Sequence, residues 1–272
     1  MAATLPGYCG AILEVNLSTG KIEKKPLNEA DVLAFGGGRG LGAKMLWDRL
    51  SPGADALAPA TPLMFLTGPY SGFPVPCASR TAVVTKSALT SPLHSKLAHA
   101  STLAYSNLGG FFAPELKFAG YDALVVTGKA AGPVYLVIDG DKVDVRDAKK
   151  FWGKGTDAVD KLLPAELGDK RFQSVYIGPA GEKLVRYATI MHTASRAAGR
   201  CGTGCVMGSK KRLTRLQPSY PLDARDSGFE ELPVPVLYRL SVSSARENAT
   251  PSMGLGVGLS GGTRNIFASL TP

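Results

Sequence analysis

Residues 195–211 read SRAAGRCGTGCVMGSKK, which concentrates four basic residues and four glycines in one short stretch. Glycine lets the backbone turn tightly or approach a ligand closely. Arg196 and Arg200 are spaced i, i+4, a spacing that puts two guanidinium groups on one side of the chain to hold an anion. The residues alone leave three roles open for this loop: a phosphate cradle, a metal site that uses Cys201 and Cys205, or a structural turn.

A metal site is the least favoured of these roles. Zinc sites usually combine a C-x₂₋₄-C pair with a second pair of Cys or His ligands. The chain has four cysteines and three histidines, and Cys9, Cys77 and His192 each stand alone in the sequence. The spacing therefore favours packing inside a glycine-rich loop as the role of Cys201 and Cys205.

The composition is that of a folded protein with anionic partners. The 272 residues are 44% hydrophobic and 19% charged, with a formal net charge of +9, so disorder along the whole chain is not expected. The basic residues are scattered and aromatic residues make up only 8%, which argues against a nucleic-acid face. Neither a signal peptide nor an apolar run of about 18 residues is present. We expect a cytoplasmic protein without a membrane span or a nucleic-acid partner.

Alternation of apolar and polar residues predicts a strand-rich α+β fold rather than a regular βαβ repeat. A hairpin is predicted around Ser18-Thr19-Gly20, and a helix over residues 28–35 with Asn28 as its N-cap and Gly36 at its end. The other predicted elements are a helix at 40–50, strands at 62–69, 81–87, 122–130 and 133–148, a helix at 155–167, and two strands within 172–192.

The composition changes after Lys211. Residues 212–272 contain six arginines and no lysine, are rich in Ser, Pro and Gly, and show little periodicity. We expect a domain over residues 1–211, followed by an atypical and poorly ordered tail over residues 212–272.

Three further segments combine glycine with an arginine or an amide. Arg80 stands at the entrance of the strand at 81–87, where its planar guanidinium could fork onto a phosphate. Asn107 precedes Gly109 in YSNLGG. The segment FGGGRGLGAK (35–44) places glycines before a helix, but it lacks the G-x₄-G-K-[ST] pattern of a P-loop. Taken alone, each of these segments is better explained as a turn or a solvated arginine than as a phosphate contact.

Taken together and in order, the segments resemble the N-terminal domain of the aldehyde ferredoxin oxidoreductase family, the tungsten-pterin enzymes. The resemblance rests on seven motifs between about Gly10 and Lys211: GAILEVNLSTGKI, GGGRGLGAKMLWD, LTGPYSG, SRTAVVTKSALT, NLGGFFAPELKFAGYDALVVTGKA, IGPAGEKLVRYATIM and RAAGRCGTGCVMGSKK. Each motif is weak alone, whereas seven in family order are specific. The resemblance implies paired β-sheets that form a base for two pterin dithiolenes, which chelate one tungsten, or molybdenum in some members.

The resemblance also implies an activity and a set of site residues. It implies oxidation of an aldehyde to its acid, with electrons passing through a [4Fe–4S] cluster to ferredoxin; relatives in the family reduce aromatic-ring thioesters. By motif position, the residues expected to contact the pterin phosphates are Arg80, Asn107, Gly109, Arg196, Ala197, Gly199 and Arg200. The main-chain oxygens of Asn107 and Ala197 are expected near a magnesium ion that links the two phosphates.

The chain departs from the family pattern in three places. Cys201 and Cys205 stand where the family usually has Gly or Ala, so they are not expected to bind the cluster. The connector SPLHSKLAHASTLAYS is longer than its family counterpart. The resemblance ends at GSKK, before the two helical domains that carry the cluster cysteines and the substrate pocket in the family. We interpret the tail as a translated shifted frame or a diverged remnant.

Three functions remain open at this point. The chain is the tungstopterin-binding portion of an enzyme that is incomplete alone, a non-catalytic pterin-binding module, or a subunit that completes its site with a partner chain. The expected partners are accordingly the pterin cofactor, ferredoxin or an iron–sulfur subunit, and a chain that carries the missing domains.

Overall fold

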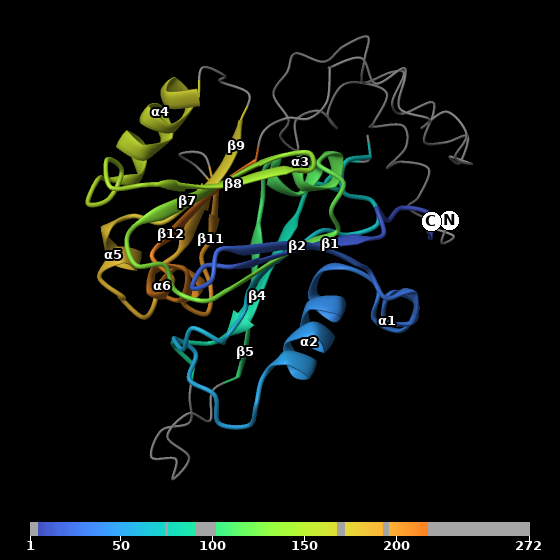
Figure 1. Cartoon of the computed structure of the whole chain (residues 1–272). Helices are drawn as coiled ribbons and strands as arrows, with labels where there is room; N and C mark the ends of the chain where they lie inside the picture. The colour runs from blue at the N-terminus through green and yellow to red at the C-terminus, as the bar shows by residue number, and fades with distance from the viewer. Residues whose placement is uncertain (1–4, 74–75, 91–101, 168–171, 193–195, 217–272) are drawn as a thin grey trace, which may run out of the picture. The chain divides into compact units, whose positions relative to one another are not determined.

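The computed structural model of the chain describes residues 5–73, 76–90, 102–167, 172–192 and 196–216. Their strands form two six-stranded sheets (Figure 1), with the orders β2-β1-β6-β3-β4-β5 and β11-β10-β9-β12-β7-β8. This arrangement confirms the predicted α+β class with paired sheets. None of the helices in these ranges is both long enough and apolar enough to cross a bilayer.

The bounds of the elements are as follows. The first sheet consists of β1 (Ala11–Asn16), β2 (Lys21–Pro26), β3 (Leu63–Leu66), β4 (Thr81–Lys86), β5 (Leu103–Leu108) and β6 (Ala123–Thr127). The second consists of β7 (Val134–Asp139), β8 (Lys142–Asp147), β9 (Gln173–Tyr176), β10 (Ile190–His192), β11 (Arg196–Ala198) and β12 (Arg212–Leu216). The helices are α1 (Glu29–Phe35), α2 (Gly38–Arg49), α3 (Phe112–Phe118), α4 (Thr156–Leu167), α5 (Pro179–Glu182) and α6 (Thr203–Ser209).

The first sheet is covered on both faces, which explains why its central strands read as continuous apolar runs. In β3, Leu63 and Phe65 belong to the larger hydrophobic cluster, which also contains residues of the second sheet. Met64 and Leu66, one residue out of phase, belong to a smaller cluster with α2. Because side chains alternate along a strand, α2 covers one face of this sheet and the second sheet faces the other.

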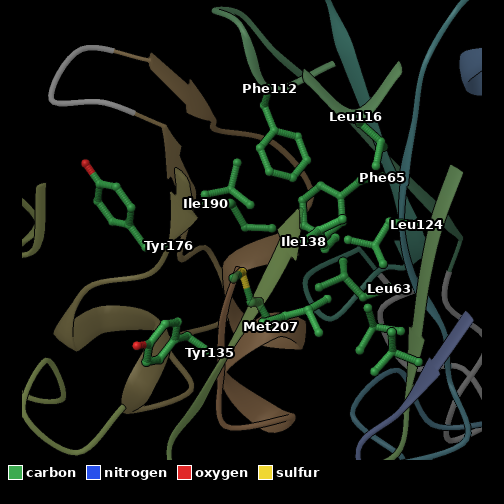
Figure 2. Close-up of a cluster of buried hydrophobic side chains, with 14 of the residues drawn as sticks. Leu63, Phe65, Phe112, Leu116, Leu124, Tyr135, Ile138, Tyr176, Ile190 and Met207 are labelled. Atoms are coloured by element: carbon green, nitrogen blue, oxygen red, sulfur yellow. The ribbon is translucent and has the colours of Figure 1, made fainter. Parts of the chain in front are cut away.

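The larger cluster fills the space between the two sheets and fixes them against each other. Figure 2 shows Phe65 of the first sheet near Phe112 of α3, with their ring centroids 5.5 Å apart. Ile138 and Ile190 approach the same space from β7 and β10, and Met207 approaches it from α6; all are fully buried. Burial of this much apolar area is the main source of stability in a domain of this size.

The local predictions near the N-terminus are confirmed. Residues of β1 pair with β2 from Ala11↔Pro26 to Asn16↔Lys21, so the hairpin turns at the predicted tripeptide. Asn28 caps α1 by accepting the backbone N–H groups of Ala30 and Asp31 on its side-chain oxygen.

Helix α6 was not predicted, because its sequence TGCVMGS has poor intrinsic helix propensity. Its two glycines instead permit close packing. A Cβ atom on Gly208 would collide with the carbonyl oxygen of Gly181 in α5, and one on Gly204 would collide with that of Thr189. All seven residues of α6 are buried, so tertiary packing stabilises this helix.

The predicted domain boundary at Lys211 is too early. Residues 212–216 form β12, which pairs in parallel with β7 and antiparallel with β9. A strand that joins two neighbours in the middle of a sheet satisfies backbone groups on both of its edges. Residues 212–216 therefore belong to the folded unit and not to a poorly ordered tail. Residues 217–272 and the connector at 91–101 lie outside the described ranges.

Candidate cofactor-binding site

Gly109 lies where the two sheets meet, between two arginine side chains. It follows β5, and Arg80 precedes β4, whose Thr81 pairs with Leu108 of β5. This register places Arg80 and Gly109 at the same end of the first sheet. A Cβ atom on Gly109 would lie 3.9 Å from Nη1 of Arg80 and 3.6 Å from Cδ of Arg196, which belongs to β11 in the second sheet. The fold thus brings three predicted site residues together from distant parts of the chain.

A hollow of about 260 Å³ adjoins this point, between the first turn of α2 and the ends of β4 and β5. Its side chains are held by neighbouring contacts. The guanidinium of Arg39 lies 5.1 Å from the ring centroid of Tyr105, and the Tyr105 hydroxyl donates to Oδ1 of Asn107 at 2.7 Å. The residues that line the hollow are Gly37, Gly38, Arg39, Gly68, Pro69, Tyr70, Ser71, Cys77, Ala78, Arg80, Ala82, Tyr105 and Asn107.

Arg39 and Tyr105 were not among the predicted site residues. Arg39 lies in FGGGRGLGAK, whose glycines before a helix fit either a phosphate site or a turn. Tyr105 lies in β5, a strand that was not predicted. The alternation of buried Ala104, Ser106 and Leu108 with more exposed neighbours is the pattern that could have indicated this strand.

The loop after β11 lies along β5. The backbone N–H of Arg200 donates to the hydroxyl of Ser106 at 3.1 Å, and Sγ of Cys201 lies 3.7 Å from the carbonyl oxygen of Tyr105. Cys201 has a positive φ of 62° and precedes Gly202, whose φ is 70°, so the chain reverses sharply here. This turn presents Arg200 on the side of the second sheet that faces β5.

The remaining predicted site residues lie on the same segment. Ala197 and Gly199 are exposed, as are Arg196 and Arg200. Ala197 pairs with Met191 in β10, and a Cβ atom on Gly199 would lie 3.9 Å from Cγ2 of Thr189. Four of the seven predicted residues (Arg80, Asn107, Gly109 and Arg196) therefore gather at the end of β4 and β5, and the other three lie on β11 and its following loop.

The site carries uncompensated positive charge. Within the described ranges, none of Arg39, Arg80, Arg196 and Arg200 forms an ion pair with a carboxylate, although ten ion pairs occur elsewhere in them. Planar guanidinium groups bind phosphate oxygens in a bidentate manner, and glycine turns let backbone N–H groups approach them. This donor set fits a phosphorylated cofactor.

The cysteines of the loop have separate surroundings. Cys205 is fully buried in α6, and its thiol contacts the carbonyl oxygen of Leu184 at 3.4 Å. Burial raises the pKa of the Cys205 thiol, so its thiolate is disfavoured. In the ranges that the structure covers, no three side chains of the His, Cys, Asp and Glu types gather as a metal site. Cys205 thus serves the packing of α6.

The order of the motifs agrees with a known domain family. Residues 12–214 match the profile of the family described as "Aldehyde ferredoxin oxidoreductase, N-terminal domain". The chain belongs to the aldehyde ferredoxin oxidoreductase family. The predicted resemblance is thereby confirmed over most of the described residues.

The proteins that are similar to this chain include tungsten enzymes. The chain is 45% identical over 204 residues to the tungsten-containing aldehyde ferredoxin oxidoreductase of Pyrococcus horikoshii. This match covers 75% of the chain and 32% of that enzyme. The chain is 35% identical over 273 residues to the aliphatic sulfonate oxidoreductase, WOR-like subunit, of Pyrococcus furiosus, covering 92% of the chain and 41% of that subunit. The latter alignment extends past Lys211, because residues 1–211 make up less than 92% of the chain.

A solved structure shows the same fold. The active-site complex BamBC of benzoyl coenzyme A reductase, in complex with 1,5-dienoyl-CoA, superposes with a TM-score of 0.72 at 37% identity. The match covers 79% of this chain and 32% of that chain. The present chain thus spans about a third of the length of these aldehyde ferredoxin oxidoreductase relatives and of this structural neighbour.

Proposed function

We propose that the chain is the tungstopterin-binding N-terminal portion of an aldehyde:ferredoxin oxidoreductase-like enzyme, incomplete alone. The observation that carries this proposal is the meeting of Arg80, Gly109 and Arg196, contributed by both sheets, where no described carboxylate pairs with either arginine. A phosphate ester carries negative charge whose burial without partners is strongly unfavourable. Two guanidinium groups and an open glycine backbone supply such partners.

The residues of the chain would divide this work between the two sheets. Arg80, Asn107 and Gly109 of the first sheet would hold phosphate oxygens from one side, and Arg196, Ala197, Gly199 and Arg200 of the second from the other. The main-chain oxygens of Asn107 and Ala197 would bind a magnesium ion between the phosphates, because oxygen ligands suit this cation. Tyr105 orients the Asn107 side chain through its hydrogen bond.

When bound, the tungsten or molybdenum bis-pterin would supply the two-electron oxidation of an aldehyde and water to a carboxylate, with release of two electrons and three protons. The contribution of this chain is to bind and orient the cofactor. The [4Fe–4S] cluster, the route to ferredoxin and the substrate pocket would come from the part of the enzyme that this chain does not span. We place the assembled enzyme in the cytoplasm.

The relatives favour a protein that works in an assembly of several subunits. Two of them are named as a subunit and as a complex, and the chain spans about a third of the length of the tungsten enzymes. A partner that carries the remaining domains would complete the site. Without such a partner, the same residues would make the chain a pterin-binding module without redox activity.

Cofactor content tests the proposal. The full chain is produced in a host supplied with tungstate, and its tungsten and pterin contents are measured by elemental analysis and by mass spectrometry of denatured protein. The double variant Arg80→Met/Arg196→Met should lose most of both. The control Arg146→Met removes an arginine of β8 that pairs with Asp144, and it should retain them. A wild-type chain without pterin would contradict the proposal.

Activity separates the enzyme from its fragment. The purified chain alone should not oxidise aldehydes, because under the proposal the electron path lies outside this chain. Turnover by this chain without a partner would contradict the proposal.

A further inference from the structure

His192 joins the two sheets directly behind the predicted phosphate site. It is the last residue of β10 and its ring is fully buried. The backbone N–H of Phe111 donates to Nε2 of His192 at 3.1 Å, and Nδ1 lies 2.8 Å from the carbonyl oxygen of Ser174 in β9. One imidazole therefore connects the turn after β5 to the second sheet.

The two hydrogen bonds define the state of the ring. Nε2 accepts a backbone N–H, so the proton of the neutral ring resides on Nδ1 and is donated to the Ser174 oxygen. Each ring nitrogen of the neutral imidazole therefore has a defined role, Nε2 as acceptor and Nδ1 as donor.

The ring also limits how close the turn lies to the second sheet. Gly110 has a φ of 98°, and a Cβ atom on it would collide with the His192 ring. The backbone of Gly110 thus rests directly on the imidazole. Gly109 precedes this contact, and His192 pairs with Arg196 in the β10–β11 ladder. Gly109 is the chain neighbour of Gly110, which contacts the ring, and Arg196 is the strand partner of His192. Both halves of the site therefore lie next to His192.

We propose that His192 is a positioning residue, which sets the spacing between the Gly109 turn of the first sheet and Arg196 of the second. The inference rests on the proposed phosphate-binding function, and it adds a residue that neither a glycine loop nor an arginine motif indicates. Its ring holds the turn at a fixed distance from the second sheet by hydrogen bonding to Phe111 and by contact with Gly110. Loss of the Phe111 bond releases the turn while both arginines remain in the chain.

Three variants of the full chain separate the two hydrogen bonds. His192→Gln places an amide oxygen near the position of Nε2, so it restores an acceptor for the Phe111 N–H. In His192→Asn the side chain is shorter, so it reaches the carbonyl oxygen of Ser174 but not the N–H of Phe111. His192→Phe fills the space and makes neither bond. The control Ile190→Val removes a methyl group from the buried core on the same strand and leaves the turn contacts in place.

Two measurements are made on each variant. The first is hydrogen exchange of the Phe111 amide by NMR, compared with exchange limited by global unfolding. The second is affinity for inorganic pyrophosphate, used as the probe of the phosphate site, by titration calorimetry. In the Phe and Asn variants we expect about tenfold faster exchange and about tenfold weaker affinity, the effect of losing one well-placed hydrogen bond. The Gln and Val variants should behave like the wild type in both.

The outcomes distinguish the inference from the function on which it rests. Unchanged exchange and affinity in His192→Phe would overturn the inference, and so would equal losses in Ile190→Val, which would indicate general destabilisation. A wild-type chain that does not bind pyrophosphate would count against the proposed function. In that case the exchange data alone decide the role of His192, and slow Phe111 exchange in His192→Phe would reject it.

Discussion

Gly109 and Gly110 are adjacent but have different reasons to be glycine. At Gly109 a Cβ atom would meet only Arg196 and Arg80 at ordinary contact distances, whereas at Gly110 it would collide with His192. Gly110 also has a φ of 98°, which is strained for any other residue. The first glycine leaves open space between two arginine side chains, and the second lets two segments pack closely.

This difference predicts different effects of alanine at the two positions. Gly110→Ala should lower the free energy of unfolding by about 2–4 kcal/mol, from overpacking and backbone strain. Gly109→Ala should change that free energy by less than about 1 kcal/mol, yet reduce pterin content because the methyl group occupies the space between the arginines. Urea unfolding and cofactor analysis of both variants check this, and equal stabilities would contradict it.

His192 also predicts how stability depends on pH. Burial is the main cause that lowers the pKa of His192, and the positive charge of Arg196 also lowers it. The hydrogen bond to Ser174 and the charge of Asp160 raise this pKa, but by less. A lowered pKa means that the unfolded chain takes up a proton at a pH where the folded chain does not. The stability from this residue is present above the ordinary histidine pKa, near 6.5, and is lost as pH falls below it.

The free energy of unfolding in urea should therefore drop between pH 7.5 and pH 5.5 in the wild type. In His192→Gln, which does not titrate, the drop should be smaller. The same drop in both proteins would assign the pH dependence to other groups.

At the scale of elements, the structure shows which patterns carry information in the sequence alone. The β1–β2 hairpin and the capped helix α1 were predicted because their turn and cap residues act locally. Strand β12 was not predicted, because RLTRL has no apolar alternation and its partners β7 and β9 lie far away in sequence. Helix α6 was missed because close approach to α5, not propensity, makes it helical.

The candidate site follows the same division. Arg80, Asn107, Gly109 and Arg196 were assigned through the family motifs, and the structure brings them together at one place. No local pattern indicates His192 or the stacking of Arg39 on Tyr105. These contacts join residues that are 81 and 66 positions apart, respectively, so they exist only in the folded chain.

The packing of α6 predicts a large effect of a small substitution. Gly208→Ala places a methyl group against the carbonyl oxygen of Gly181, and we expect a loss of about 1–3 kcal/mol in the free energy of unfolding. Gly132→Ala is the matched control, since a Cβ atom there meets nothing within 4 Å. Denaturant titrations should separate the two variants clearly. Equal free energies of unfolding for the two variants would show that α6 accommodates the added methyl group without loss of stability.

At the scale of the whole molecule, β12 determines where the folded unit can end. A chain that stops at Lys211 lacks the strand between β7 and β9, leaving backbone groups of both strands unpaired. We predict that this chain loses cooperative unfolding, whereas a chain that stops after Leu216 retains it. Calorimetry of the two truncated chains tests the prediction, and a cooperative transition in the shorter chain would refute it.

The position of β12 has a consequence for synthesis on the ribosome. The second sheet cannot close until its last described strand has emerged from the exit tunnel, since β12 inserts between strands that were made earlier. The second sheet, which carries Arg196 on β11, is therefore completed after Arg80 and Gly109 have been translated. The two-sheet arrangement around Arg80, Gly109 and Arg196 is therefore complete only after residue 216 has left the ribosome.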